Sequence, residues 1–503
     1  MLFCLNPRIR CGGRGVLSAL AVCAAGGGIA PLVAMAQVCP DPSFAAPVSY
    51  ATPASCRCVA VGDFNVDGHP DLVACYGTTT SANVGVLLNQ GSGTGTFAPV
   101  VSNSVVTTAA FLAVGDFNGD TIPDVAVTYS GTGSTTVVGV MFGLGNGTLL
   151  PAVTYPVGGT TRHVAVGDFN EDGWPDLAVA TGTTTGVSVL LNNGNGTFGA
   201  ATQYGGATNV LWSAVADFNH DNHADLVLSI SGGTISVLLG DGNGGFAAPL
   251  SVAAGQGVSV AAGDLNGDGN TDVVVGTSGS GSQVTVLLGD GMGGFSPPVT
   301  YPGAASPQSV AIADFNSDGK PDIVSTSIVA SVSNSYVYRN LGGGMFQAGA
   351  AFPTLLNNFR VATGDLNGDG KPDFVVTSSN QVGVTVVLNT TGPCVPAGVC
   401  CRGTTCNTTF ADATACAASV PGASTTHGVW SPAQSCNATG NTSTPCCHAD
   451  YDKMNGVQVA DVFAMLNDWF AGYKFVVLGG DGDQGTLAVQ NIFDFLNAWF
   501  VGC

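Results

Sequence analysis

The chain has 503 residues, a formal charge of −21 at pH 7 and only 9% charged residues. With 45% hydrophobic residues and 73 glycines, this composition excludes both a charged helical protein and a charged disordered chain. Only 12 residues are Lys or Arg, too few to bind a phosphate backbone, so nucleic acid is excluded as a partner.

Residues 1–36 have the features of a secretory signal. A basic start is followed by an apolar, small-residue run that ends in Ala34-Met35-Ala36, the pattern of an A-x-A cleavage site. Two alternatives remain: an uncleaved anchor, because the run is long enough to span a bilayer, and lipoprotein processing at Cys23. No later segment resembles a transmembrane helix. We therefore expect a secreted, periplasmic or cell-surface protein with no transmembrane helix after signal removal.

Residues 37–391 contain seven copies of a nine-residue acidic loop, spaced about 50 residues apart. The copy at 264–272 reads Asp-Leu-Asn-Gly-Asp-Gly-Asn-Thr-Asp, and every copy has Asp at positions 1, 5 and 9 and Asn at position 3. Of the 33 acidic residues in the chain, 21 are the aspartates at positions 1, 5 and 9 of these loops. The copies begin at Asp63, Asp116, Asp168, Asp217, Asp264, Asp314 and Asp365.

The spacing of these side chains predicts calcium sites. Oxygen ligands at alternate positions, with a Gly for a sharp turn, suit calcium coordination. An EF-hand needs Glu at position 12, where the first copy has Ala74. One such loop could be a simple polar turn, but seven copies favour short calcium loops holding up to seven ions. The predicted ligands are Asp63, Asn65, Asp67, Asp71, Asp116, Asn118, Asp120, Asp124, Asp168, Asn170, Asp172, Asp176, Asp217, Asn219, Asp221, Asp225, Asp264, Asn266, Asp268, Asp272, Asp314, Asn316, Asp318, Asp322, Asp365, Asn367, Asp369 and Asp373.

Apolar runs flank each loop in a fixed order. In the fifth copy the predicted strands are 258–262, 273–276, 284–288 and 298–301, with the loop between the first two. Four strands in about 50 residues is the size of one propeller blade. The sequence therefore predicts a mainly β domain over residues 37–391.

The two ends of this region are complementary. The seventh unit stops at 386–389 without a fourth strand, while residues 44–50, before the first loop, match 295–301 of the fifth unit. The N-terminal strand is therefore predicted to complete the last blade. A ring closed in this way leaves no long exposed sheet edge.

The motif Val-Gly-Asp-Phe-Asn-x-Asp-Gly-x-Pro-Asp, seen at 61–71, resembles the FG-GAP or VCBS repeat of the integrin α-subunit propeller. That resemblance implies a seven-bladed β-propeller with a calcium-loaded hairpin between the first two strands of each blade. Thr121 and Asn222 replace the Gly at position 6. Because β-branched residues adopt left-handed backbone poorly, the loop at Asp116 is expected to be the weakest site.

Residues 392–449 differ in composition and hold eight cysteines. In an exported chain they predict a small disulfide-stapled segment, with zinc binding as the alternative, although no C-x-x-C pair is present. Cys39, Cys56, Cys58 and Cys75 are predicted to staple the N-terminal strand. The exported form has 13 cysteines, an odd number, so one thiol is free or pairs between molecules. The eight cysteines are Cys394, Cys400, Cys401, Cys406, Cys416, Cys436, Cys446 and Cys447.

Residues 450–503 contain a second repeat, in which 459–470 matches 489–500. Apolar residues at i, i+3, i+4 and i+7 predict two amphipathic helices. Together with Cys-Cys-Arg-Gly-Thr-Thr-Cys at 400–406, they resemble the GC-type dockerin-like module of exported planctomycete proteins, which implies attachment to an envelope or scaffold partner. Met454 stands where a loop ligand belongs, so calcium binding by these loops is left open.

No motif in the chain predicts catalysis. Neither a G-x-S-x-G elbow nor an H-E-x-x-H helix is present, and the only Glu, Glu171, lies inside an Asp loop. Side chains at loop position 7, such as His223, are expected to be solvated. His163 and His220 have no partner in the sequence pattern. Trp174 and Trp212 are candidates to line a sugar site, with blade packing as the favoured interpretation.

These observations favour an exported calcium-binding propeller that acts as a cell-surface or extracellular binding or adhesion protein. Its ligand would be a glycan or a protein, and its C-terminal module would attach it. The alternative is a hydrolase or lyase acting on polysaccharides from a propeller scaffold. Propellers support both functions, but the missing Glu and nucleophile motifs favour binding.

Overall fold

The computed structural model describes residues 37–396 except for gaps at 78–81, 92, 106–108, 130–135, 183–185, 206–208, 278–282, 329–333, 355–357 and 379–381. It describes short strands elsewhere. The predicted signal segment, most of the cysteine-rich segment and the predicted helix pair lie outside the described residues. The chain divides into two compact units, residues 39–393 and the remainder.

Short antiparallel pairs are all that is described of the second unit. They are β1 (Leu2–Phe3) with β2 (Val22–Cys23), β3 (Gln37–Val38) with β33 (Val395–Pro396), β34 (Cys400–Arg402) with β35 (Thr405–Asn407), and β36 (Val476–Leu478) with β37 (Gln484–Thr486). The described part of the chain contains no helix, and hence none long and apolar enough to cross a membrane.

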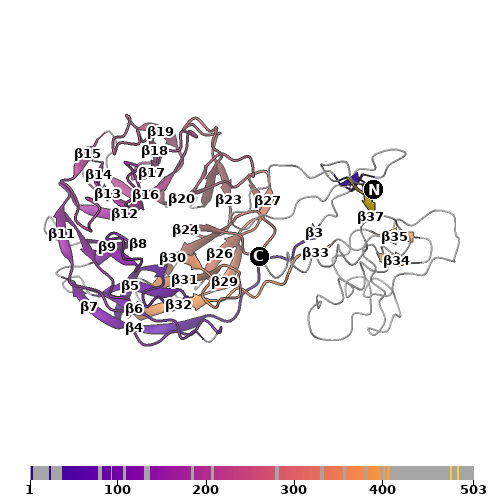
Figure 1. Cartoon of the computed structure of the whole chain (residues 1–503), viewed down its shortest axis with the longest axis horizontal. Coiled ribbons are helices and arrows are strands. Elements are labelled where there is room, and N and C mark those ends of the chain that lie inside the picture. The colour runs from indigo at the N-terminus through magenta and orange to yellow at the C-terminus, as the bar shows by residue number, and fades with distance from the viewer. Residues whose placement is uncertain are drawn as a thin grey trace. The chain divides into compact units, whose positions relative to one another are not determined.

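The unit of residues 39–393 is built from repeated four-stranded antiparallel sheets arranged around a common centre (Figure 1). We number the repeats 1 to 7 by their Asp loops. Repeat 1 has β4 (Val48–Gly62), β5 (Asp71–Gly77), β6 (Ala82–Leu87) and β7 (Val101–Val105); repeat 2 has β8 (Ala109–Gly115), β9 (Asp124–Tyr129), β10 (Val137–Met141) and β11 (Val153–Pro156); repeat 3 has β12 (Thr161–Gly167), β13 (Asp176–Thr181), β14 (Val187–Leu190) and β15 (Thr202–Tyr204).

The later repeats follow the same order. Repeat 4 has β16 (Val210–Ala216), β17 (Asp225–Ile230), β18 (Thr234–Leu238) and β19 (Leu250–Ala253); repeat 5 has β20 (Gly257–Gly263), β21 (Asp272–Thr277), β22 (Val284–Leu287) and β23 (Val299–Tyr301); repeat 6 has β24 (Pro307–Ala313), β25 (Asp322–Ser327), β26 (Asn334–Tyr338) and β29 (Ala350–Pro353), with a hairpin of β27 (Asn340–Gly342) and β28 (Met345–Phe346); repeat 7 has β30 (Asn358–Gly364), β31 (Asp373–Ser378) and β32 (Val382–Val387).

The strands of the fifth repeat confirm the sequence prediction to within one or two residues. The second strand of every repeat is buried along its whole length, as in β21. It lies between two strands of its own sheet and is covered on both faces by neighbouring sheets, which explains its continuous run of apolar residues. The fourth strand, such as β23, is largely exposed. Burial therefore decreases from the second strand toward the outer edge.

Hydrophobic clusters join consecutive repeats. Seven clusters occur among the described residues, each between two neighbouring sheets. One of them combines Leu72 and Tyr76 of repeat 1 with Leu366, Val375 and Val384 of repeat 7. The first and last repeats thus pack on each other in the same way as the repeats between them.

Strand β4 belongs to two sheets. Its first half pairs with β32, with Tyr50 opposite Val384 and Val48 opposite Val386, and its second half pairs with β5. Before β4, Phe44 forms a bridge with Asn389. The result is one seven-stranded sheet in the order β30-β31-β32-β4-β5-β6-β7. Strand β4 thus follows β32 in this sheet.

A recurring hydrogen bond links each repeat to the preceding one. Its acceptor is the main-chain carbonyl of loop position 2, and its donor lies in the turn after the third strand of the next repeat. The donor is an Asn side-chain amide in four cases: Asn89 to Leu366, Asn192 to Phe117, Asn340 to Leu265 and Asn389 to Phe315, at 2.7–2.9 Å. It is a Gly main-chain N–H in the other three: Gly147 to Phe64, Gly244 to Phe169 and Gly293 to Phe218, at 2.8–3.1 Å.

Candidate metal-binding loops

The first Asp of each loop organises the loop backbone. In the first loop, Asp63 Oδ1 accepts the N–H of Asp67 at 3.1 Å, and Asp63 Oδ2 accepts that of Gly68 at 2.8 Å. The second of these bonds, from position 6 to position 1, recurs in all seven loops at 2.8–2.9 Å. Each loop is therefore wrapped around the carboxylate at its own start.

The Asp at position 9 is buried in every repeat and ties the loop to the sheet. Its Oδ2 accepts the N–H of position 2 at 2.8–3.1 Å. Its Oδ1 accepts an N–H from the turn after the third strand at 2.6–2.8 Å. The seven side chains, all 0% exposed, are Asp71, Asp124, Asp176, Asp225, Asp272, Asp322 and Asp373.

The electrostatics of position 9 show that the loop carboxylates act on one another. Burial raises the pKa of Asp71 to about 6; hydrogen bonds from the main chain lower it, and the charges of Asp67 and Asp63 raise it again. The same causes raise the pKa of Asp322 to about 7. The other five are raised in the same direction: Asp124, Asp176, Asp225, Asp272 and Asp373. A cation among three such carboxylates would relieve their repulsion.

The donor set of each loop consists of oxygen atoms. Asn65 Oδ1 accepts the N–H of Asp67 at 3.2 Å, and Asn65 Nδ2 donates to Asp67 Oδ2 at 2.8 Å, so positions 3 and 5 lie side by side. Within the described ranges, no three His, Cys, Asp or Glu side chains converge closely enough to hold a metal ion by themselves. A cation in these loops would also need the Asn side chain and main-chain carbonyls. Such a hard-oxygen set fits calcium.

The structure also shows a backbone requirement at position 4 that the sequence pattern does not reveal. Position 4 has positive φ in every loop, including Val66 at 56° and Glu171 at 58°. Position 6 is also left-handed, and Thr121 adopts φ 67° there. The N–H of Thr121 still donates to Asp116 Oδ2 at 2.8 Å, as Gly does elsewhere. The loop at Asp116 therefore keeps the hydrogen bond from position 6 to position 1 that the other loops have, but its Thr121 holds a left-handed backbone that strains a β-branched residue.

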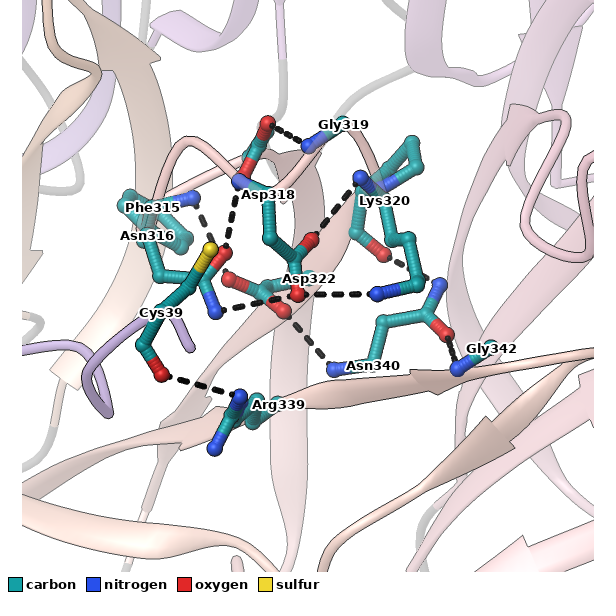
Figure 2. Close-up of polar contacts among 12 residues, drawn as sticks. Cys39, Phe315, Asn316, Asp318, Gly319, Lys320, Asp322, Arg339, Asn340 and Gly342 are labelled. Carbon is teal, nitrogen blue, oxygen red and sulfur yellow. Dashed lines mark hydrogen bonds and ion pairs between the residues drawn. The ribbon is translucent and has the colours of Figure 1, made fainter. Parts of the chain in front are cut away.

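The loop of repeat 6 has additional contacts (Figure 2). Lys320 Nζ donates to Asp318 Oδ2 at 3.0 Å, and the Asp318 side chain is only 6% exposed. The N-terminal segment lies beside this loop, because Arg339 donates to Cys39 O at 3.1 Å and to Asp41 Oδ1 at 2.7 Å. Asn316 is fully buried here. Among the seven loops, this one has the most buried side chain at position 3.

Two loop histidines make contacts that the sequence pattern did not reveal. His223, at loop position 7, is not simply solvated: its Nδ1 contacts Glu171 Oε1 in the loop of the preceding repeat. His220 Nε2 lies 2.7 Å from Asn270 Oδ1 in the following loop. These contacts bridge neighbouring loops, which are far apart in sequence, so a sequence pattern within one loop could not reveal them.

His163 also has partners, contrary to expectation. Its ring stacks on Trp212 with centroids 4.2 Å apart, and its Nδ1 lies 3.1 Å from Ser213 Oγ. Both partners belong to the next repeat. Trp212 is packed, as expected, against the core between repeats 4 and 5, and its ring also contacts those of His163 and Phe111 from other repeats.

The described cysteines only partly follow the expected stapling. Cys58 and Cys75 form a disulfide with Cα atoms 5.2 Å apart, which joins β4 to β5 within repeat 1. Cys39 is also disulfide-bonded. Cys56 is a free, buried thiol, whose pKa burial raises to about 12. Cys56 therefore does not staple the N-terminal strand.

The profile of the FG-GAP-like repeat family matches six stretches of the chain, of which the first five overlap, and together they contain all seven Asp loops. The chain belongs to this family. The matched residues are 63–127, 116–179, 168–228, 217–275, 264–325 and 327–376. The FG-GAP-like repeats account for the propeller-like sheets of the structure. No curated protein sequence matches this chain.

Many solved structures resemble the chain, and two of them illustrate the likeness. One is described as the basis of recognition of non-reducing terminal N-acetylglucosamine by a lectin of Agrocybe aegerita, with 19% identity, a TM-score of 0.41 and coverage of 67% of this chain and 86% of that one. The other is BBS1N in complex with ARL6DN, with 13% identity, a TM-score of 0.49 and coverage of 70% of this chain and 99% of that one.

Proposed function

We propose that the protein is an exported, calcium-stabilised seven-bladed β-propeller that binds a glycan or protein ligand at the cell surface or outside the cell. The observation that supports the calcium assignment is the sevenfold recurrence of one loop, in which the same main-chain hydrogen bonds hold the carboxylates at positions 1 and 9 and the Asn at position 3 contacts the carboxylate at position 5. Bound calcium would neutralise these carboxylates and hold the loop against the sheet.

Calcium removal tests this assignment. A metal bound only by the folded state stabilises it by mass action, so the melting temperature should fall markedly in excess EDTA and recover with millimolar calcium. Asp67→Asn should remove about one bound ion per molecule. Asp241→Asn, at an exposed turn where Oδ1 accepts the N–H of Asn243 and Gly245, should leave the number unchanged. Equal melting in EDTA and calcium would refute calcium binding.

Closure of the ring by the N-terminal strand is the second part of the proposal. It is supported by the pairing of Tyr50 with Val384, by the shared core of repeats 1 and 7, and by the Asn89–Leu366 hydrogen bond. Deleting residues 37–52 would expose the edge of β32, and such an edge promotes association. The shortened protein should aggregate or be cleaved first near 360–390. A monomeric, equally stable product would instead indicate an open array.

Export and attachment form the third part. The Cys58–Cys75 disulfide is typical of a protein folded in an oxidising compartment. We propose that the C-terminal segment, with its dockerin-like sequence repeat, attaches the propeller to an envelope or scaffold. A chain ending at residue 391 should keep its calcium yet be released from the fraction that retains the full chain. Equal retention of both would contradict the attachment role.

Binding, rather than catalysis, is tested by a glycan array run beside a screen for hydrolase and lyase activity. Binding without turnover is the expected result. Glu171, the chain's only Glu, contacts His223 rather than standing free as an acid. Turnover of any polysaccharide would replace the binding function with the enzymatic alternative.

A further inference from the structure

Side chains from four repeats meet near the start of the innermost strands. The guanidinium carbon of Arg360, on β30, lies 4.5 Å from the ring centre of Phe111 on β8 and 4.7 Å from that of Trp212 on β16. His163, on β12, stacks on the Trp212 ring and contacts the edge of Phe111 at 5.3 Å. All four stand five residues before the first Asp of their own loops. We call these four residues the central cluster.

The hydrogen bonds of Arg360 leave one edge of the guanidinium free. Nη1 donates to Gln308 O at 2.8 Å and to Phe359 O at 3.2 Å. Nε is buried and makes no hydrogen bond within the described residues, and Nη2 makes none there either. Nε–H and Nη2–H form the side of a guanidinium whose two parallel donors match the two oxygens of a carboxylate.

Arg360 has no acidic partner. It is only 9% exposed, and the described residues give it no ion pair. Burial lowers its pKa to about 9, so it remains charged at neutral pH. Burial and the Arg360 charge lower the pKa of His163 to about 3, so His163 is neutral. The central cluster therefore carries one positive charge that lies over aromatic rings, Phe359 at 3.9 Å among them, but has no carboxylate counterion among the described residues.

The fold separates the acidic residues from this cluster. Every acidic residue between 42 and 393 lies in an Asp loop or in a turn after a third strand. The Asp loop joins the first and second strands, and the other turn follows the third, so in an antiparallel sheet both lie at the same end. The first, innermost strand of each sheet begins at the opposite end. Arg162 lies near the start of β12, and Arg57 lies in the half of β4 that pairs with β5; both stand one residue before the level of the central cluster. That end of the propeller is thus basic in an otherwise acidic protein.

The central cluster combines an unused two-donor edge with partly exposed aromatic rings. Two further buried hydroxyls without a hydrogen-bond partner, those of Ser259 and Ser309, occupy the same level on β20 and β24. A buried donor without an acceptor is costly, so a ligand oxygen would be favoured here. Phe111, His163 and Trp212 are only partly buried, so the cluster reaches the surface.

We propose that the central cluster binds a carboxylate, either a small free acid or the carboxylate of an acidic sugar, with the Nε–Nη2 edge of Arg360 as its anchor. This inference rests on the proposed function as a binding protein and names the face and the ligand chemistry. It is independent of calcium, because the Asp loops lie at the other end of the strands.

The test is a titration of the full chain with sodium D-glucuronate, sodium acetate and D-glucose at constant ionic strength. Tryptophan fluorescence reports on Trp212, and the melting temperature reports on binding independently. We expect saturable responses to glucuronate and acetate but not to glucose. A tighter response to glucuronate assigns the site to an acidic sugar, and equal responses assign it to small carboxylates.

Variants connect the response to the anchor. Arg360→Lys keeps the charge but loses the paired donors, so carboxylate affinity should fall about tenfold. Arg360→Met should abolish the response. If the Arg360→Met variant does not fold, the affinity of the Arg360→Lys variant provides the test. Arg162→Met, which removes an exposed Arg at the same end, is the matched control and should bind as the parent does.

Two results would overturn the proposal: no saturable response of the folded parent to either carboxylate, or equal affinity of the parent and a folded Arg360→Lys variant. A glycan-array ligand bound equally by the parent and by Arg360→Lys would leave the binding function standing while refuting this site. The two conclusions can therefore fail separately.

Discussion

The side-chain amide of Asn89 donates a 2.8 Å hydrogen bond to the main-chain carbonyl of Leu366, 277 residues further along the chain. The bond from Asn192 to Phe117, within the body of the repeat array, has the same donor, the same acceptor position and nearly the same length of 2.9 Å. The contact between the first and last repeats therefore has the chemistry of a contact between consecutive repeats.

Asn89→Ala should destabilise the protein by about 1–3 kcal/mol, because it leaves the carbonyl of Leu366 buried without its donor. Asn192→Ala should cost a similar amount, and Asn193→Ala, at an exposed neighbouring position, should cost less than about 0.5 kcal/mol. Urea unfolding measures all three. If Asn192→Ala destabilises but Asn89→Ala does not, repeats 1 and 7 are not joined in solution.

Thr121→Gly and Val66→Gly should each stabilise the protein by about 1 kcal/mol, since both residues hold left-handed backbone that a β-branched side chain disfavours. Asn222→Gly, at φ 66°, should change stability by only a few tenths of a kcal/mol because Asn tolerates this conformation. Unfolding should be measured in EDTA, so that altered metal affinity does not contribute. A loss of stability in Thr121→Gly would contradict the strain argument.

Removing the Cys58–Cys75 disulfide should cost about 3 kcal/mol, because its cysteines are 17 residues apart and the bond restricts the unfolded chain. The double variant Cys58→Ser, Cys75→Ser is compared with the oxidised parent by urea unfolding. Reduction of this bond in the parent, verified by mass spectrometry of the alkylated thiols, should lower stability by the same amount. A reduced parent as stable as the oxidised one would show that the bond does not constrain the fold.

His163 should make the protein more sensitive to acid. Its pKa is about 3 in the folded protein against an ordinary value of 6.5, so the unfolded chain takes up the proton first as pH falls. The stability from neutral His163 is complete above pH 6.5 and is lost as pH falls toward 3. From pH 7 to 5.5 the loss is roughly 1 kcal/mol.

The measurement is the unfolding free energy at pH 7 and pH 5.5 in the parent and in His163→Gln, which keeps an acceptor for Ser213. The loop carboxylates titrate equally in both proteins, so the difference between them isolates His163. Identical pH dependence in the two proteins would show that His163 is not held neutral by its surroundings.

Much of the candidate site could be predicted from the sequence because its information is local. Asp at positions 1, 5 and 9 and Asn at position 3 lie within nine residues, and short Val-rich runs between turn residues predicted the strands of the fifth repeat to within one or two residues. The match between residues 44–50 and 295–301 likewise predicted that the N-terminal strand pairs with the last repeat, and β4 does pair with β32. Because the Asp loop recurs seven times, the same side-chain spacing could be read in seven independent copies.

The remaining features are contacts between repeats, and only the tertiary structure decided them. The left-handed backbone at Val66 follows from the path that the loop takes around Asp63. The choice between an Asn amide and a Gly N–H as the donor to the preceding repeat depends on the turn that each repeat adopts. Arg360 meets Phe111 and Trp212 across roughly 150 to 250 residues of chain. A periodic sequence pattern does not predict this contact. It forms only when the sheets surround a common centre, which brings corresponding positions of their first strands close together.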